Sequence, residues 1–154
     1  MKEKNKTLLL IFIPFLWGYI INILVWKVSI IGDLYFRLNI VWETIFILFW
    51  FWTGTKFAQY NSNKVKAYII GNSIWLLSFL VYIWQFILLS GESRSFRLAG
   101  LSQHYIAGIV FISKKIIRLF TNTISSETVI IFSYSLMITI FTTGFIYRIK
   151  NKNN

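Results

Sequence analysis

Residues 8–31 read LLLIFIPFLWGYIINILVWKVSII, an apolar run in which Lys27 is the single charged residue. A helix rises 1.5 Å per residue, so roughly 20 such residues cross the hydrocarbon core of a bilayer. Three further apolar runs of similar character, at residues 40–57, 67–90 and 128–147, fill most of the 154-residue chain. The sequence therefore predicts an all-α integral membrane protein with four transmembrane helices.

The overall composition supports the same class. Hydrophobic residues make up 56% of the chain, and a water-soluble domain of this length leaves too much surface exposed to hide them. The first apolar run is too long for the core of a signal peptide, and no small-residue cleavage site follows it. The segments between the runs are short and polar. Residues 1–154 are therefore predicted to form a single membrane domain whose first span is retained.

The charge is strongly basic, with 16 Lys and Arg against 5 Asp and Glu. Because these cations flank apolar runs, they are expected to set orientation and to contact anionic lipids rather than nucleic acid. With four spans, nine basic residues fall on one side and seven on the other, which favours cytoplasmic termini. The nine are Lys2, Lys4, Lys6, Lys56, Lys64, Lys66, Arg148, Lys150 and Lys152. Heavy use of Ile, Phe, Asn, Lys and Tyr is typical of AT-rich coding sequence and indicates a bacterial or mobile-element origin, so a bacterial inner membrane is the expected location.

The stretch after the third run is ambiguous. Residues 98–113 are moderately apolar, contain several polar side chains and are short for a span. If they crossed, the protein would have five spans and the tail would change sides, with an unchanged charge tally. Polar and small positions of residues 103–120 cluster on one helical side, which predicts an interfacial or re-entrant amphipathic helix between the third and fourth spans. We favour this arrangement over five crossings.

Two spans carry small or polar residues at four-residue spacing. Such residues favour contact between helices in lipid, because they allow close approach and hydrogen bonding. The predicted contact face serves either packing within the bundle or assembly of a homo-oligomer or pore. Pro14 is also expected to bend the first span. The face comprises Pro14, Gly18 and Asn22 in the first span and Ser135, Thr139 and Thr143 in the fourth.

Lys27 and Glu43 lie about one turn on either side of the first connection. In an antiparallel hairpin they reach similar depth, so the sequence predicts an ion pair that lowers the cost of two charges near the membrane. The alternative is that Glu43 couples to a cation or a proton.

Enzymatic chemistry is not expected. The chain has no cysteine and a single histidine, His104. A nucleophilic triad or a protein metal site cannot be assembled from so few candidate groups. The sequence therefore predicts no catalytic, metal or cofactor-binding residues.

Three functional classes are compatible with this pattern. The first is a sensor or scaffold that recruits a cytosolic partner protein through its basic surfaces. The second is a small homo-oligomeric channel or holin-like pore, and the third is an immunity or accessory subunit of an exporter. Residues predicted to contact a cytoplasmic partner or lipid are Lys56, Lys64, Lys66, Arg148 and Lys150.

A small chain with four spans and basic cytoplasmic loops resembles the membrane subunit of bacterial anti-phage systems of the Kiwa type. The resemblance covers architecture alone. It implies a homo-oligomer that senses membrane disturbance and recruits a cytosolic, DNA-binding effector in antiviral defence, and it assigns no particular residues.

Overall fold

The structure is a computed structural model that describes residues 2–27 and 29–151; the side chains of residues 2, 3, 26, 29 and 31 lie outside that description. Every regular element in the described part is helical. The elements are α1 (Lys2–Leu9), the 3₁₀ turn η1 (Leu10–Phe12), α2 (Ile13–Lys27), α3 (Ser29–Arg37), α4 (Asn39–Tyr60), α5 (Lys64–Gly71), α6 (Ser73–Tyr82), the π-helical η2 (Ile83–Leu88), the 3₁₀ turn η3 (Gly91–Ser93), α7 (Phe96–Ile106), α8 (Val110–Arg118) and α9 (Ser126–Lys150).

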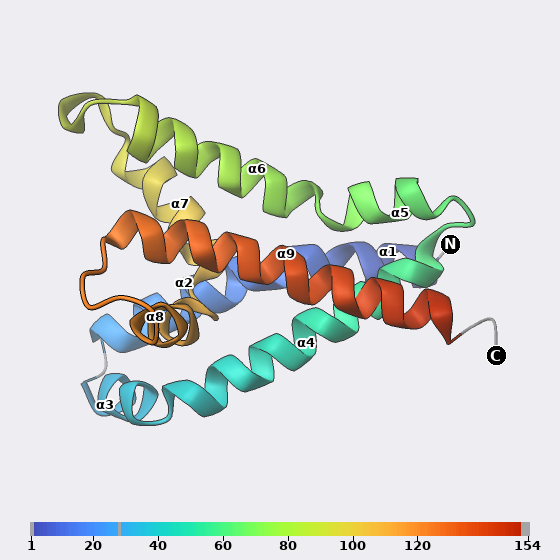
Figure 1. The fold of residues 1–154 in the computed structure, drawn as a ribbon, viewed down its shortest axis with the longest axis horizontal. Coiled ribbons are helices and arrows are strands. Elements are labelled where there is room, and N and C mark those ends of the chain that lie inside the picture. The colour runs from blue at the N-terminus through green and yellow to red at the C-terminus, as the bar shows by residue number, and fades with distance from the viewer. Residues whose placement is uncertain (1, 28, 152–154) are drawn as a thin grey trace.

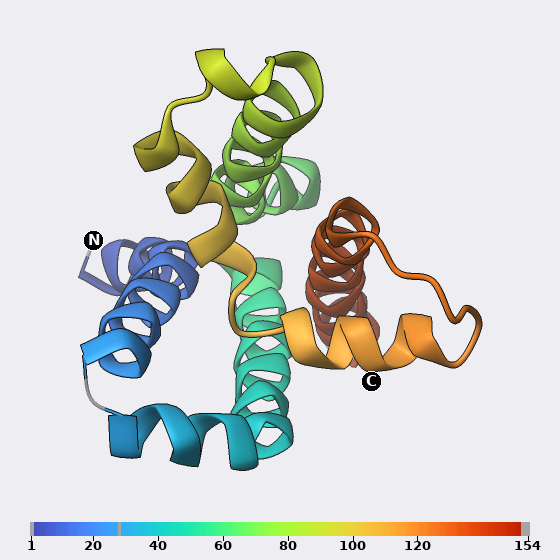
Figure 2. The same ribbon diagram turned by 90° about the vertical axis from the view of Figure 1, so that its left-hand side faces the viewer.

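The long helical rods lie along a common direction. Figure 1 shows α1–α2, α4, α5–α6 and α9 running between two ends of the molecule, with both chain termini at the same end. The shorter α3 and α8 lie crosswise at the opposite end (Figure 2). Helix α9 packs most extensively against α4 and also contacts α6, α7 and α8. The fold is therefore an all-α bundle organised around α9.

Within the described residues, two helices are long and apolar enough to cross a membrane, Lys4–Val25 and Ser126–Lys150. A third span is possible if Lys64–Gly71 and Ser73–Leu88, which are bent by 44° relative to each other, act together. Helix α4 is long enough, with 22 residues. It is not one of these candidate spans, and Glu43 and Lys56 interrupt its apolar run. The all-α class is confirmed, whereas the predicted count of four spans is not supported.

Two details of the first span differ from expectation. Helix α2 ends at Lys27 rather than at residue 31, and the predicted connection at 32–39 is largely the helix α3. Pro14 is the second residue of α2, directly after η1, where the amide of Ile13 donates to Leu10 O. A missing N–H costs little in the first turn of a helix. In place of a bend within one α-helix, the structure has a short 3₁₀ turn directly before Pro14.

The segment predicted as one amphipathic helix at 103–120 is two helices, so that prediction is wrong in detail. Helix α7 enters the bundle and ends near its middle, where the Tyr105 ring lies 5.1 Å from Phe15 and 6.2 Å from Trp50, centroid to centroid. The chain turns at residues 107–109, where a Cβ on Gly108 would lie 2.6 Å from the Phe46 ring. It then returns as α8 to the end from which α7 came (Figure 1). Residues 96–118 thus form an inserted helix, α7, and a crosswise helix, α8, rather than one straight helix.

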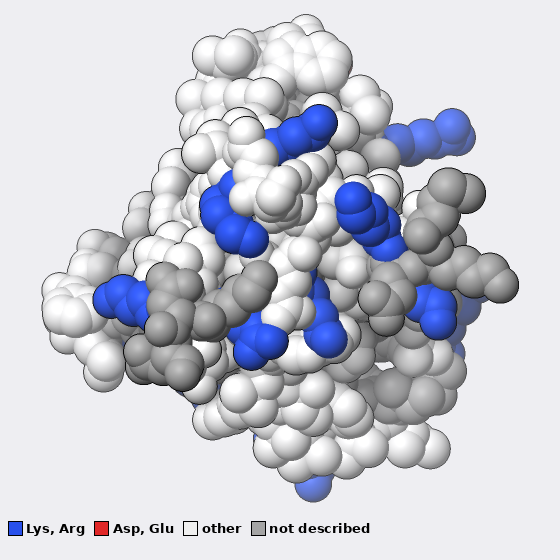
Figure 3. All heavy atoms as spheres, turned by 90° about the vertical axis from the view of Figure 1, so that its right-hand side faces the viewer, with Lys and Arg blue, Asp and Glu red and all other residues white. Residues whose placement is uncertain are grey.

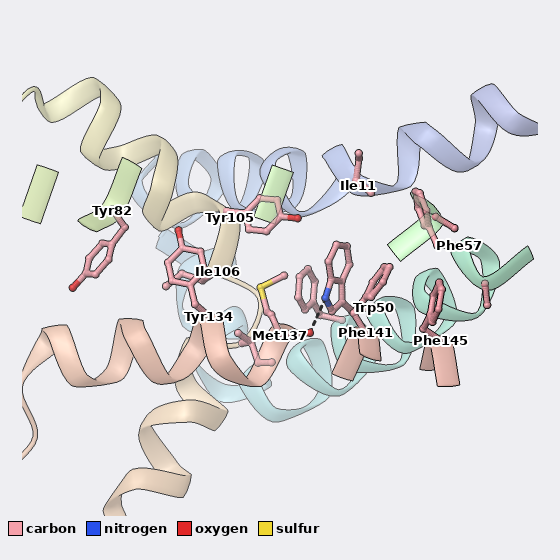
Figure 4. Close-up of a cluster of buried hydrophobic side chains, with 14 residues drawn as sticks. Ile11, Trp50, Phe57, Tyr82, Tyr105, Ile106, Tyr134, Met137, Phe141 and Phe145 are labelled. Carbon is pink, nitrogen blue, oxygen red and sulfur yellow. Dashed lines mark hydrogen bonds between the residues drawn. The ribbon is translucent and has the colours of Figure 1, made fainter. Parts of the chain in front are cut away.

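The interior is built from aromatic side chains around α9 (Figure 4). The indole N–H of Trp50 donates to Met137 O at 3.0 Å, and that of Trp75 donates to Tyr134 O at 3.0 Å. The Tyr134 hydroxyl donates to Ser102 O of α7 at 2.8 Å. These bonds satisfy polar groups that would otherwise be costly in an apolar interior, and they tie α4, α6 and α7 to α9.

The two predicted contact faces behave differently. In the first span, Pro14 and Gly18 are buried while Asn22 is exposed. A Cβ on Gly18 would overlap the carbonyl oxygen of His104, so this position packs against α7. Pro14 and Gly18 therefore pack within the chain, whereas Asn22 does not.

The fourth-span face points outward. Ser135, Thr139 and Thr143 are exposed, and their hydroxyls donate to the carbonyls four residues earlier at 3.0, 2.8 and 2.8 Å. The buried side of α9 carries Met137, Phe141 and Gly144 instead. Hydroxyls that bond to their own helix in this way are tolerated in lipid.

Candidate functional site

The end of the molecule that carries both termini is basic. Figure 3 views this end directly, and Lys and Arg but no Asp or Glu appear among the described residues on it. The basic residues that were expected on one side form three clusters, at the N-terminus, around the turn between α4 and α5, and at the C-terminus. The three clusters lie together at this end, as the course of α1, α4, α5 and α9 in Figure 1 requires. Lys152 and the side chain of Lys2 lie outside the described residues. We call the set Lys4, Lys6, Lys56, Lys64, Lys66, Arg148 and Lys150 the basic end.

The turn between α4 and α5 holds part of the basic end in place. The Asn63 side chain accepts from Lys66 N at 3.0 Å and caps α5. The Lys64 ammonium donates to Ala58 O at 2.8 Å and to Asn61 O at 3.1 Å, at the last turn of α4. A cation at this position satisfies free carbonyls and complements the helix dipole. Lys64 is therefore structural, while Lys66 and Lys150 remain exposed.

A groove of about 410 Å³ opens between α1 and α4 at this end. The Lys56 ammonium lies 5.2 Å from the centroid of the Trp52 ring, a cation–π distance. With its amide oxygen facing α9, Gln59 accepts from Nε and Nη2 of Arg148. The groove is lined by Lys4, Lys6, Thr7, Leu10, Trp52, Lys56, Gln59 and Tyr60. We call it the α1–α4 groove.

The chemistry of this groove is that of anion binding. None of its lining residues is acidic, and three of them are lysines. It contains no nucleophile paired with a general base. Elsewhere in the described part of the chain, no group of three His, Cys, Asp or Glu side chains could hold a metal.

The predicted ion pair between Lys27 and Glu43 does not form. Lys27 is exposed, and the Glu43 carboxylate is fully buried, where it accepts from Phe111 N at 2.8 Å and from Ile112 N. Those amides belong to the first turn of α8, whose N–H groups have no partner within the helix. Burial beneath α8 thus replaces the cation with a helix N-terminus, which attracts a carboxylate for the same electrostatic reason.

His104 lies on α7, with its ring edge-on to Tyr19 at a centroid distance of 6.1 Å. Partial burial lowers the pKa of His104 below its usual value, because burial disfavours the charged imidazolium. The neutral form is therefore preferred in the fold, which agrees with a packing role.

A second groove, of about 280 Å³, lies among α2, α3 and α4 and is entirely apolar in character. Its lining includes Trp17, Leu24, Leu34, Tyr35 and Trp42. Burial and, to a smaller extent, the charge of Glu43 raise the pKa of Tyr35 to about 12, so its hydroxyl stays neutral. This groove offers no charged group to a ligand.

Comparison with protein-family models, with curated proteins and with solved structures finds no match. Functional inference therefore starts from the basic end. The sequence alone identified its cations but not the groove, although the four-residue spacing of Trp52 and Lys56 is a signal for their contact. The partnership of Gln59 with Arg148 has no such signal, because the two residues lie on different helices.

Proposed function

We propose that this chain is a non-enzymatic subunit of a bacterial inner membrane that recruits a cytosolic partner through its basic end. The observation that carries the proposal is the gathering of three separate basic clusters at one end, without a described acidic side chain on the face seen in Figure 3. Such a surface steers and orients an acidic protein. Basic ends also face the cytoplasm in membrane proteins.

In this proposal the four long rods all cross the membrane. Helix α4 would insert together with its neighbours, since the Glu43 carboxyl group accepts hydrogen bonds from α8 and Lys56 belongs to the basic end, where it can reach the interface. Pairs of chains would meet through the outward hydroxyl face of α9, Ser135, Thr139 and Thr143. A sensor or scaffold role in envelope stress or phage defence follows from the architectural resemblance to Kiwa-type subunits.

The test is co-expression with the proteins encoded beside this gene, followed by purification of the complex in nanodiscs. We expect an acidic cytosolic partner to bind in a salt-sensitive manner, and Lys66→Gln with Lys150→Gln to weaken the complex. The matched control is Lys114→Gln with Arg118→Gln, which removes the same charge from the opposite end. Equal effects of the two double variants, or no effect of either, would contradict docking at the basic end.

The second candidate function is a homo-oligomeric pore, favoured by the exposed hydroxyl face of α9. Ser and Thr hydroxyls that return to their own helix can still line a water-filled passage. Bilayer recordings of the purified chain distinguish the two functions. Robust conductance without a partner would replace the scaffold proposal, whereas a tight membrane agrees with it.

A further inference from the structure

We propose that the α1–α4 groove is a binding site for the phosphate head group of an anionic phospholipid. This site is independent of partner docking and requires only that the chain lies in a membrane. The groove combines three ammonium groups with two exposed or partly exposed aromatic side chains, Trp52 and Tyr60. Its volume of about 410 Å³ falls within the range of small-ligand sites.

The groove lies at the position along the α1–α2 rod where a lipid head group is expected. The candidate span begins at Lys4, so Lys4 and Lys6 lie at the level where apolar chain gives way to polar head groups. Tyr60 is the last residue of α4 and lines the groove near this level, whereas Trp52, eight residues earlier, lies about 12 Å deeper along the same helix. Aromatic residues with a polar edge concentrate at this boundary.

The lysines that line the groove are not neutralised by described acidic neighbours. Lys56 is held over the Trp52 ring, which fixes its ammonium at the groove and reduces the side-chain freedom lost on binding. The bond between Gln59 and Arg148 brings a further cation from α9 beside the groove. Like charges gathered in this way repel one another, and a bound phosphate relieves that repulsion.

Exposed apolar side chains follow the lysines of the groove along the α1–α2 rod. Leu9, Phe12 and Leu16 are 64%, 46% and 57% exposed. Leu10 lines the groove itself. A molecule that fills the site thus meets the ammonium groups and also the apolar surface of Leu10 and Trp52. An anionic lipid has both features, whereas inorganic phosphate has only the first.

The experiment is native mass spectrometry of the detergent-solubilised full chain, titrated with phosphatidylglycerol. The expected result is a saturable bound lipid whose affinity falls about tenfold or more in Lys6→Gln/Lys56→Gln. The matched control is Lys66→Gln/Lys150→Gln, which removes two charges at the same end but outside the groove. This control should bind phosphatidylglycerol as the unmodified chain does.

Several outcomes would overturn the proposal. Equal loss of affinity in both double variants would indicate general attraction to the basic end. Equal binding of phosphatidylcholine would remove the dependence on net negative charge, and competition by millimolar inorganic phosphate would indicate a soluble ligand. Lys6→Gln alone, at an exposed position, provides the test if the double variant does not fold, and it should also weaken binding. Because docking is tested with Lys66 and Lys150, failure of the lipid site and failure of partner recruitment are distinguishable.

Discussion

At the residue scale, Glu43 shows how the fold accommodates a buried carboxyl group by hydrogen bonds to the start of a helix. Its carboxylate is fully buried on α4, and both of its oxygens accept from backbone amides at the start of α8. Removing a carboxylate from water is costly unless hydrogen bonds replace its hydration. Two amides with an aligned helix dipole supply that replacement. Glu43 therefore fastens the crosswise α8 to the first turns of α4, and Lys115 adds a 3.5 Å contact to Asn39 nearby.

Replacement of Glu43 by Gln should destabilise the fold by about 1–3 kcal/mol, because one of the two amides of α8 would face an NH₂ group instead of an acceptor. Hydrogen exchange at Phe111 and Ile112 should accelerate in the same variant. The measurement is thermal unfolding in nanodiscs together with amide exchange.

Lys27→Gln is the informative comparison for this experiment. Lys27 is exposed and does not contact Glu43, so its loss should change stability by less than about 0.5 kcal/mol. A penalty as large as that of Glu43→Gln would mean that the ion pair expected from the sequence exists in the membrane and that the α8 cap does not.

At the element scale, the contact between α4 and α9 depends on one glycine from each helix. A Cβ on Gly54 would overlap Phe141 O, and a Cβ on Gly144 would overlap Phe51 O. The backbones of the two helices thus touch directly. Small residues permit such close packing in membranes, where dispersion contacts replace the hydrophobic effect as the attraction between helices.

Gly54→Ala or Gly144→Ala should separate α4 from α9 and cost about 1–3 kcal/mol, the usual penalty for overpacking. The bond from Trp50 to Met137 O, between the same helices, should lengthen, with a shift in Trp fluorescence. Gly91→Ala serves as the control, since nothing lies within 4 Å of its added Cβ. Unchanged stability in both helix variants would show that the two backbones are farther apart than the structure has them.

Apolar runs predicted the helices well, since α9 extends the predicted run at 128–147 by only a few residues on each side. They did not predict which side of α9 is buried. Spacing by four selects Ser135, Thr139 and Thr143 as readily as it selects Met137 and Phe141, and the aromatic residues of α4, remote in sequence, decide between them. The same limit applies to Glu43, whose partners lie 68 and 69 residues away. An apolar run is visible in a sequence, but the rotation of a helix about its axis is a tertiary property.

At the scale of the whole molecule, the two ends differ more in acidic than in basic residues. The end with both termini receives nine of the 16 Lys and Arg and one acidic residue, Glu3, by sequence position. The other four acidic residues, Asp33, Glu43, Glu92 and Glu127, belong to the opposite end. Lys and Arg orient membrane proteins, while Asp and Glu contribute little. The distribution of nine basic residues against seven therefore favours cytoplasmic termini only modestly. The acids matter for partners, because they leave only one end strongly positive.

Single cysteines test this orientation directly, since the chain has none of its own. We expect Ser62→Cys and Asn151→Cys to be protected from a membrane-impermeant maleimide in intact cells, and Ser93→Cys and Thr123→Cys to react. All four positions are exposed, so protection reports the side of the membrane rather than burial in the protein. Thr123 is decisive, because the chain enters as α7 and returns as α8 to one end before α9 begins (Figure 1). Protection at Thr123 with reaction at Asn151 would mean that residues 98–120 cross the bilayer, and the re-entrant arrangement would then be wrong.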